Sequence, residues 1–98
     1  MYLPFKPVSV RTYNVALKAG LRLDCAEDAT FVADLCCAGL VRNGGIKTAI
    51  ELYRAAGYGA WNIWKNLQYS AYSVEHLTLE DIKRQCERFD YELHQPLD

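Results

Sequence analysis

Residues 28–58, DATFVADLCCAGLVRNGGIKTAIELYRAAGY, hold two apolar segments that each end in Ala-Gly followed by an apolar residue. The two endings are Ala38-Gly39-Leu40 and Ala56-Gly57-Tyr58, and Ala19-Gly20-Leu21 upstream has the same form. A helix commonly ends at a glycine in the left-handed conformation, and the apolar residue that follows packs back on the last turn. Three such endings at nearly equal spacing therefore predict three successive helices of about three turns each.

Apolar periodicity before each glycine supports these three helices. Val10, Tyr13 and Leu17 recur at three- and four-residue steps, after Ser9 as the expected N-cap. Asp28 is the expected N-cap of the second helix. The expected apolar positions of the second and third helices are Phe31, Val32, Leu35 and one of Cys36 and Cys37, followed by Ile46, Ala49, Ile50 and Tyr53.

Two further helices follow the break at Gly57-Tyr58-Gly59. Ala60, Trp64 and Leu67 lie at helical spacing. The last helix has the firmest start signal, because residues 78–81, Thr-Leu-Glu-Asp, resemble a capping box that Leu77 and Ile82 flank as a hydrophobic staple. Its apolar stripe consists of Leu79, Ile82, Cys86, Phe89 and Leu93.

The fold class follows from this pattern. No segment alternates convincingly as a strand. We predict an all-α fold, a compact orthogonal bundle of about five short helices at residues 10–19, 28–38, 46–56, 60–69 and 79–92. Residues 1–98 form a single helical domain, in which 1–9 is an extended, proline-containing lead-in and 93–98 is a flexible tail.

Composition narrows the classes of function. The chain has 98 residues, is 51% hydrophobic and carries a formal net charge of −1. The apolar content excludes intrinsic disorder, and the near-neutral charge argues against a protein that coats polyanions. No apolar run approaches the roughly 20 residues of a membrane span, and residues 1–10 lack the apolar core of a signal peptide. We therefore expect a cytoplasmic protein without a membrane partner.

The charge is unevenly distributed along the chain. Residues 1–74 carry eight basic and five acidic side chains, whereas residues 75–98 carry three basic and seven acidic ones. The body is therefore mildly basic and the last helix is acidic. We interpret the acidic segment as a solvated outer helix face.

We interpret the four cysteines as buried free thiols. Cys36 and Cys37 are adjacent, and neighbouring cysteines rarely pair because the geometry is strained. No short Cys-x-x-Cys or His pair marks a zinc site, so we expect no metal and no cofactor. A thiol-dependent activity around Cys36, Cys37 or Cys86 would require a lowered thiol pKa.

Serine-based catalysis has equally little support. Ser70 and Ser73 have only His76 as a nearby base. A serine–histidine catalytic site also needs a third polar group and an oxyanion pocket. We therefore expect no catalytic residues and no enzyme.

Residues 53–72 contain half of the aromatic side chains in a fifth of the chain. A thin core cannot bury all six of them, and exposed Trp and Tyr beside Lys or Arg are common anchors of interfaces. The amide and lysine side chains of residues 60–69 lie at helical spacing opposite the apolar stripe. The predicted partner-binding residues are Tyr58, Trp61, Asn62, Trp64, Lys65, Asn66, Tyr69 and Tyr72.

Residues 46–68 resemble the helix-turn-helix of the tetracycline-repressor family. In that resemblance Ala56-Gly57-Tyr58 is the turn, and Ile63 and Leu67 are the inward residues of the second helix. The resemblance implies that the polar face of the second helix lies in the major groove, where Asn suits adenine and Lys suits guanine or phosphate. The implied DNA-binding residues are Arg42, Lys47, Arg54, Asn62, Lys65 and Asn66.

Two functions follow from these patterns. The leading hypothesis is a small non-catalytic protein-interaction module, an inhibitor or adaptor of a larger protein complex. One concrete version is an anti-CRISPR-like inhibitor of host defence carried by a phage or mobile element, although the same aromatic surface could equally be the seam of a homodimer. The alternative is a helix-turn-helix DNA-binding regulator that reads through residues 60–68.

Overall fold

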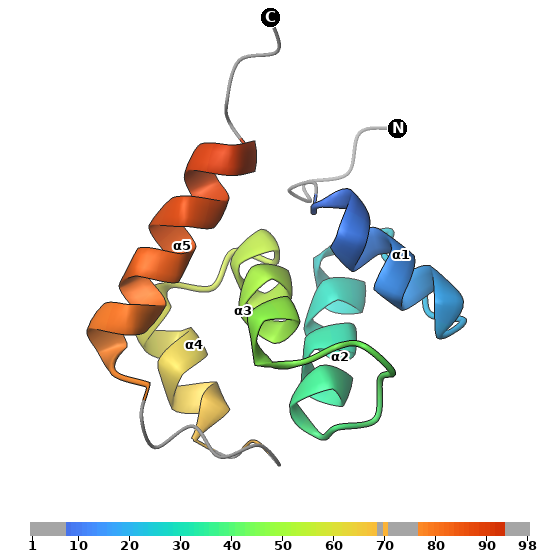
Figure 1. Cartoon of the computed structure of the whole chain (residues 1–98), viewed down its shortest axis with the longest axis horizontal. Coiled ribbons are helices and arrows are strands. Elements are labelled where there is room, and N and C mark those ends of the chain that lie inside the picture. Colours follow the sequence, from blue (N-terminus) through green and yellow to red (C-terminus); the bar gives the residue numbers. More distant parts are fainter. Residues whose placement is uncertain (1–7, 69, 71–76, 94–98) are drawn as a thin grey trace, which may run out of the picture.

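The structure, a computed structural model, describes residues 8–68, 70 and 77–93, and it is an all-α globule of five helices within those residues. Residues 94–98 of the predicted tail and most of the predicted lead-in lie outside the described residues, whereas Leu93 belongs to α5 and not to a tail. In Figure 1, α3 occupies the middle, with α1 and α2 on one side and α4 and α5 on the other. The five predicted helices are confirmed, and their observed bounds are α1 Val10–Lys18, α2 Ala26–Cys37, α3 Ile46–Ala55, α4 Ala60–Leu67 and α5 Leu79–Leu93.

The three glycine endings are confirmed as helix C-termini. Gly20, Gly39 and Gly57 have φ angles of +73°, +74° and +98°, which is the left-handed region that favours glycine. At each ending the residue after the glycine donates its backbone N–H to a carbonyl five residues earlier, as Tyr58 does to Tyr53 over 3.0 Å. This is the bonding of the Schellman motif, and it satisfies carbonyls that the helix leaves unpaired.

The N-terminal caps predicted from the sequence are observed for α1 and α5, whereas the cap of α2 is a different residue. Ser9 caps α1 by accepting the Thr12 N–H, and Thr78 and Asp81 form the predicted reciprocal capping box. The prediction for α2 is wrong, because that helix begins at Ala26 and its N-cap is Cys25. Asp28 instead lies in the first turn, where its carboxylate accepts the backbone N–H of Asp24 over 2.9 Å.

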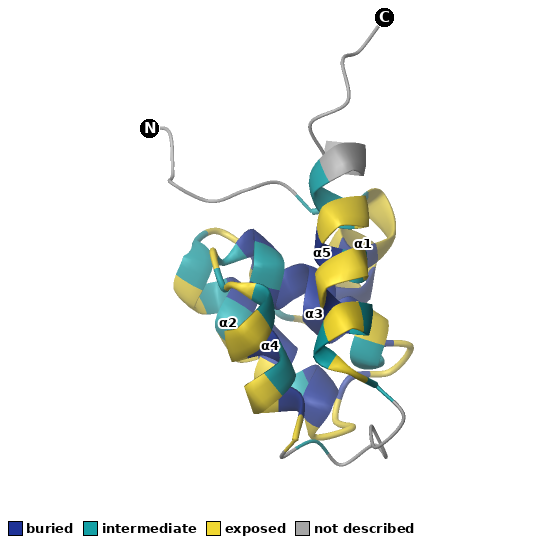
Figure 2. Cartoon of the chain, turned by 90° about the vertical axis from the view of Figure 1, so that its left-hand side faces the viewer, coloured by how far each residue is buried: buried dark blue, intermediate teal, exposed yellow. Residues whose placement is uncertain are grey.

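The core centres on α3, which is buried on almost every side. Ala49, Ile50 and Tyr53 are buried as predicted, and Ile46 packs against the core. Figure 2 shows the buried positions gathered toward α3, while the outer faces of α2, α4 and α5 are exposed. Two further buried anchors come from each of α4 and α5: Ile63, Leu67, Ile82 and Cys86.

The rest of the predicted α5 stripe is only partly buried. Phe89 packs against the core as a partly buried side chain, and Leu79 is half-buried. The side chain of Leu93 lies outside the described part of the chain. The stripe prediction for α5 is therefore confirmed at its centre, where the helix lies against α3 and α4.

The apolar stripe predicted for α1 faces solvent instead of the core. Val10 is 77% exposed, and Tyr13 and Leu17 are also exposed. The buried side of α1 carries Thr12, Val15 and Ala16. Hydrogen bonding explains this orientation. The Ser9 hydroxyl donates to the Glu51 carboxylate of α3 over 3.2 Å, and Ser9 Oγ lies 3.2 Å from Thr12 Oγ1.

Phe31 on α2 is likewise exposed, contrary to the prediction. The side of α2 that packs on the core carries small residues, Ala29 and Ala33 with Val32, and both Cys36 and Cys37 are buried. Small side chains let two helices approach closely, and Phe31 lies on the far side of α2 from Ala29 and Ala33. Within the described ranges, no helix is long and apolar enough to cross a membrane.

Candidate functional site

The exposed side of α4 carries four of the predicted partner-binding residues, which we call the α4 face: Trp61, Asn62, Lys65 and Asn66. Trp61 is 53% exposed, and the Lys65 ammonium lies 4.9 Å from the centroid of its ring. Such a cation–π contact holds both side chains in place at the surface. On the next turn, Asn66 Nδ2 donates to the Asn62 carbonyl over 2.8 Å.

The opposite side of α4 fixes this face on the domain. Ile63 and Leu67 are fully buried in the core. An anchored helix presents its outer side chains without paying for the ordering of the backbone on binding. The α4 face is therefore a preformed surface with an aromatic side chain at one end and an amide pair beside it.

Two further predicted residues, Tyr58 and Trp64, are half-buried and serve the fold. The Tyr58 ring stacks on that of Tyr53, with centroids 5.1 Å apart. Trp64 Nε1 donates to the Leu77 carbonyl over 3.3 Å, which ties the start of the α5 segment to α4. Tyr69 and Tyr72 lie outside the described residues.

The basic residues of the predicted DNA-binding set are placed at different parts of the molecule. Arg54 bridges α3 to α5, since its Nε donates to Asp90 over 3.0 Å and its Nη1 donates to the Tyr58 carbonyl. The hydrogen bond to Asp90 raises the pKa of Arg54. Arg42 and Lys47 line hollows beside α1, and no α4 residue lines either hollow.

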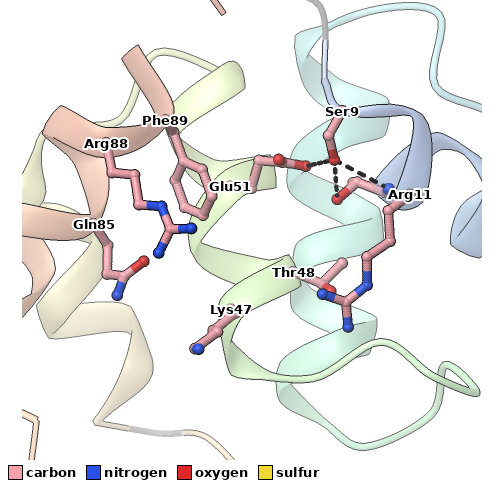
Figure 3. A pocket seen from close by; sticks show the side chains of 9 residues that line it. Ser9, Arg11, Lys47, Thr48, Glu51, Gln85, Arg88 and Phe89 are labelled. Atoms are coloured by element: carbon pink, nitrogen blue, oxygen red, sulfur yellow. Dashed lines mark hydrogen bonds between the residues drawn. The ribbon is translucent and has the colours of Figure 1, made fainter. Parts of the chain in front are cut away.

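A hollow that the sequence did not reveal lies between α1, α3 and α5 (Figure 3). We call it the three-helix hollow, and its volume is about 300 Å³. It has one cationic side chain from each helix and one carboxylate. Its lining residues are Ser9, Arg11, Thr12, Lys47, Thr48, Glu51, Gln85, Arg88 and Phe89.

Sequence patterns could not find the three-helix hollow, because its residues come from three distant segments. The sequence predicts Ser9 only as a helix cap, and Lys47 only as a DNA-binding residue of a helix-turn-helix. One feature of the sequence nevertheless indicates a polar site at α3. Glu51 interrupts the apolar run of α3, and a carboxylate in a helix that is otherwise buried needs polar partners.

A second hollow adjoins the first along α1 and shares Arg11 with it. It has a volume of about 620 Å³ and also contains Lys18 of α1 and Arg42 of the α2–α3 loop. The two hollows together place five cationic side chains on the surface that α1 forms with its neighbours. Those residues are Lys18, Arg42, Arg11, Lys47 and Arg88.

Cys36, Cys37 and Cys86 are buried as predicted, in a way that opposes thiol chemistry, whereas Cys25 is only half-buried. Burial raises the pKa of the Cys36 thiol to about 11, and it also raises the pKa values of Cys37 and Cys86. A nucleophilic thiol requires the opposite shift. Cys37 Sγ lies 3.8 Å from the Tyr53 hydroxyl, which donates a hydrogen bond to Asp34.

In the part of the chain that the structure describes, no three His, Cys, Asp or Glu side chains gather in a way that could hold a metal ion. Of the residues considered for serine chemistry, Ser70 donates to the Cys37 carbonyl over 3.1 Å, while Ser73 and His76 lie outside the described residues. Comparison of the chain with protein-family models, with curated proteins and with solved structures finds no match in any of the three.

Proposed function

We propose that the chain is a non-catalytic protein-interaction module that binds a larger protein through the α4 face. The observation that carries this proposal is the exposed Trp61 ring held against Lys65 on a helix whose other side is locked in the core. Tryptophan beside a cation is typical of residues that contribute most to binding energy in protein interfaces. An inhibitor or adaptor of a larger complex, such as a phage or mobile-element inhibitor of host defence, is the form of this function that we favour.

The chemistry of the α4 face also indicates what the partner surface offers. Trp61 provides a flat apolar area that fits a shallow apolar pocket. Lys65 adds one positive charge next to it, and Asn62 provides amide groups that donate and accept hydrogen bonds. A partner surface with an apolar pocket beside a carboxylate would therefore be complementary.

The test is a pull-down with the tagged chain from an extract of the organism that encodes it. Trp61→Ala should abolish capture of the partner that the wild-type chain retains, while circular dichroism shows an unchanged fold. Tyr13→Ala is the matched control, because it removes an exposed aromatic ring on α1, on the other side of α3. A folded Trp61→Ala variant that retains the partner in full would contradict the proposal, as would loss of the partner only with Tyr13→Ala.

DNA binding is the second candidate function, and one observation favours it. Asn62, Lys65 and Asn66 are exposed together on the outer side of α4. A mobility-shift assay at low salt, with random-sequence duplexes, tests this function because phosphate contacts dominate affinity under those conditions. Retention that is lost in Asn62→Ala and Lys65→Ala would support DNA binding, and absence of any retained duplex would exclude it.

A further inference from the structure

The three-helix hollow has a positively charged rim built from three separate helices. Arg11 comes from α1, Lys47 from α3 and Arg88 from α5. Figure 3 shows Lys47 and Arg88 extending into the same space from two sides, with Arg11 and Thr48 on the opposite wall. Among the described residues, neither Arg11 nor Lys47 takes part in an ion pair. The first turn of α3, which contains Lys47, adds the positive end of the helix dipole.

The floor of this hollow is polar and almost fully buried. Glu51 is 5% exposed, and its Oε2 accepts a hydrogen bond from the Ser9 hydroxyl. Within the part of the chain that the structure describes, Oε1 of the same carboxylate accepts no hydrogen bond. Thr48 is also buried and adds a hydroxyl to the wall. The floor therefore offers a hydrogen-bond acceptor to any ligand that carries a donor.

The cationic rim and the polar floor together favour a ligand that carries two kinds of chemical group, a phosphate and a hydroxyl. A phosphate suits three cations better than a carboxylate does, since it carries more charge and more acceptor oxygens. A bare anion at the floor would be repelled by Glu51, whereas a hydroxyl group would donate a hydrogen bond to it. Phe89 adds a half-buried aromatic wall against which a sugar or a base can pack.

We propose that the three-helix hollow binds a small organic phosphate with free hydroxyl groups, such as a sugar phosphate or a mononucleotide. Its phosphate lies between Arg11, Lys47 and Arg88, and a hydroxyl donates to Glu51. A volume of about 300 Å³ is at the lower end of small-molecule sites and suits one such molecule. None of the lining residues belongs to α4, so this site is independent of the proposed function.

Isothermal titration calorimetry with the intact chain tests the site. The probes are ribose 5-phosphate and adenosine monophosphate, compared with ribose, inorganic phosphate and a 12-base-pair DNA duplex. We expect saturable binding of at least one organic phosphate, at least tenfold tighter than that of inorganic phosphate or ribose. Lys47→Ala should weaken this binding about tenfold, and Lys65→Ala, which removes an exposed cation on α4, should leave it unchanged.

Glu51→Gln gives a second and sharper readout. This substitution keeps the size of the side chain but removes the negative charge, so the preference for an organic phosphate over inorganic phosphate should shrink. No saturable binding of either organic phosphate at millimolar concentration would overturn the proposal. Equal affinity for inorganic phosphate, or tighter binding of the duplex that is lost in Lys47→Ala, would also overturn it.

Discussion

The α4 face and the three-helix hollow are the two candidate binding regions, and they are built in opposite ways. The α4 face comes from one eight-residue helix, is convex and has an aromatic ring at its surface. The hollow combines side chains of α1, α3 and α5 around a buried carboxylate. A convex aromatic surface suits a macromolecule, whereas a concave charged one suits a small ligand. The two proposed sites therefore differ in the size of the ligand that each is shaped to bind.

The α4 face and the three-helix hollow also differ in the interactions that hold them in place. The apolar packing of Ile63 and Leu67 fixes the α4 face, while one hydrogen bond from Ser9 to Glu51 holds the α1 wall of the hollow. Burial of a large apolar side chain stabilises a fold by more than a single hydrogen bond does. Damage to the α4 anchor should therefore cost more stability than damage to the α1 wall.

The largest effect should follow removal of an anchor beneath the α4 face. Leu67→Ala leaves a cavity in the core and should lower the free energy of unfolding by about 2–5 kcal/mol. Urea denaturation followed by circular dichroism measures this loss. A loss below about 1 kcal/mol would mean that α4 is not anchored as the structure places it.

The next effect concerns the α1 wall of the hollow. Ser9→Ala removes both the N-cap of α1 and the hydroxyl that donates to Glu51, and should destabilise the chain by about 1–2 kcal/mol. Ser9→Thr, which keeps a hydroxyl group, is the control and should restore most of the stability. Hydrogen exchange of the α1 amides should also increase in Ser9→Ala. Unchanged exchange would contradict the role given to this hydroxyl.

A third effect tests the turn between α3 and α4, which sets the direction of the α4 face. Gly57 has a φ angle of +98°, and a Cβ there would meet no atom within 4 Å, so Gly57→Ala is penalised only by backbone strain. We expect a loss of about 1 kcal/mol. Gly57→Asn is the matched control, because Asn adopts the left-handed conformation more readily than Ala does. Its loss of stability should be clearly smaller than that of Gly57→Ala, and equal losses in both variants would contradict this explanation.

The smallest effect on stability is expected on the α4 face itself. Lys65→Ala removes the cation above Trp61 and should lower stability by about 0.5 kcal/mol, the lower end of the range for an exposed cation–π pair. A double-mutant cycle with Trp61→Ala measures the coupling between the two side chains. A coupling near zero would show that Lys65 does not hold the ring in solution.

Local rules predicted much of the fold from the sequence. Gly20, Gly39 and Gly57 mark their helix ends because only glycine adopts the left-handed conformation at little cost. The centre of the predicted α5 stripe, Ile82 and Cys86, is buried because α5 packs its apolar side against α3 and α4. The predicted α1 stripe faces solvent, because the Ser9 hydroxyl bonds to Glu51 of α3 and the side of α1 that carries Thr12, Val15 and Ala16 is buried instead.

The two candidate sites also differ in how far local sequence rules predict them. The exposed side of α4 follows from helical spacing within one segment, so its outward residues could be predicted. The three-helix hollow depends on which helices meet, and no pattern within a single segment encodes that. Arg54 shows the same limit, since its ion pair with Asp90 spans 36 positions along the chain.

The most direct test of the proposed function is site-specific crosslinking in cells of the encoding organism. A photo-crosslinking amino acid is placed at Asn62 on the α4 face or at Asn14 on α1, two exposed asparagines on different helices. If a larger protein binds through the α4 face, the variant at position 62 should crosslink to one partner and the variant at position 14 should not. Crosslinks to that partner from position 14 alone, or no protein crosslink at position 62, would contradict the proposal.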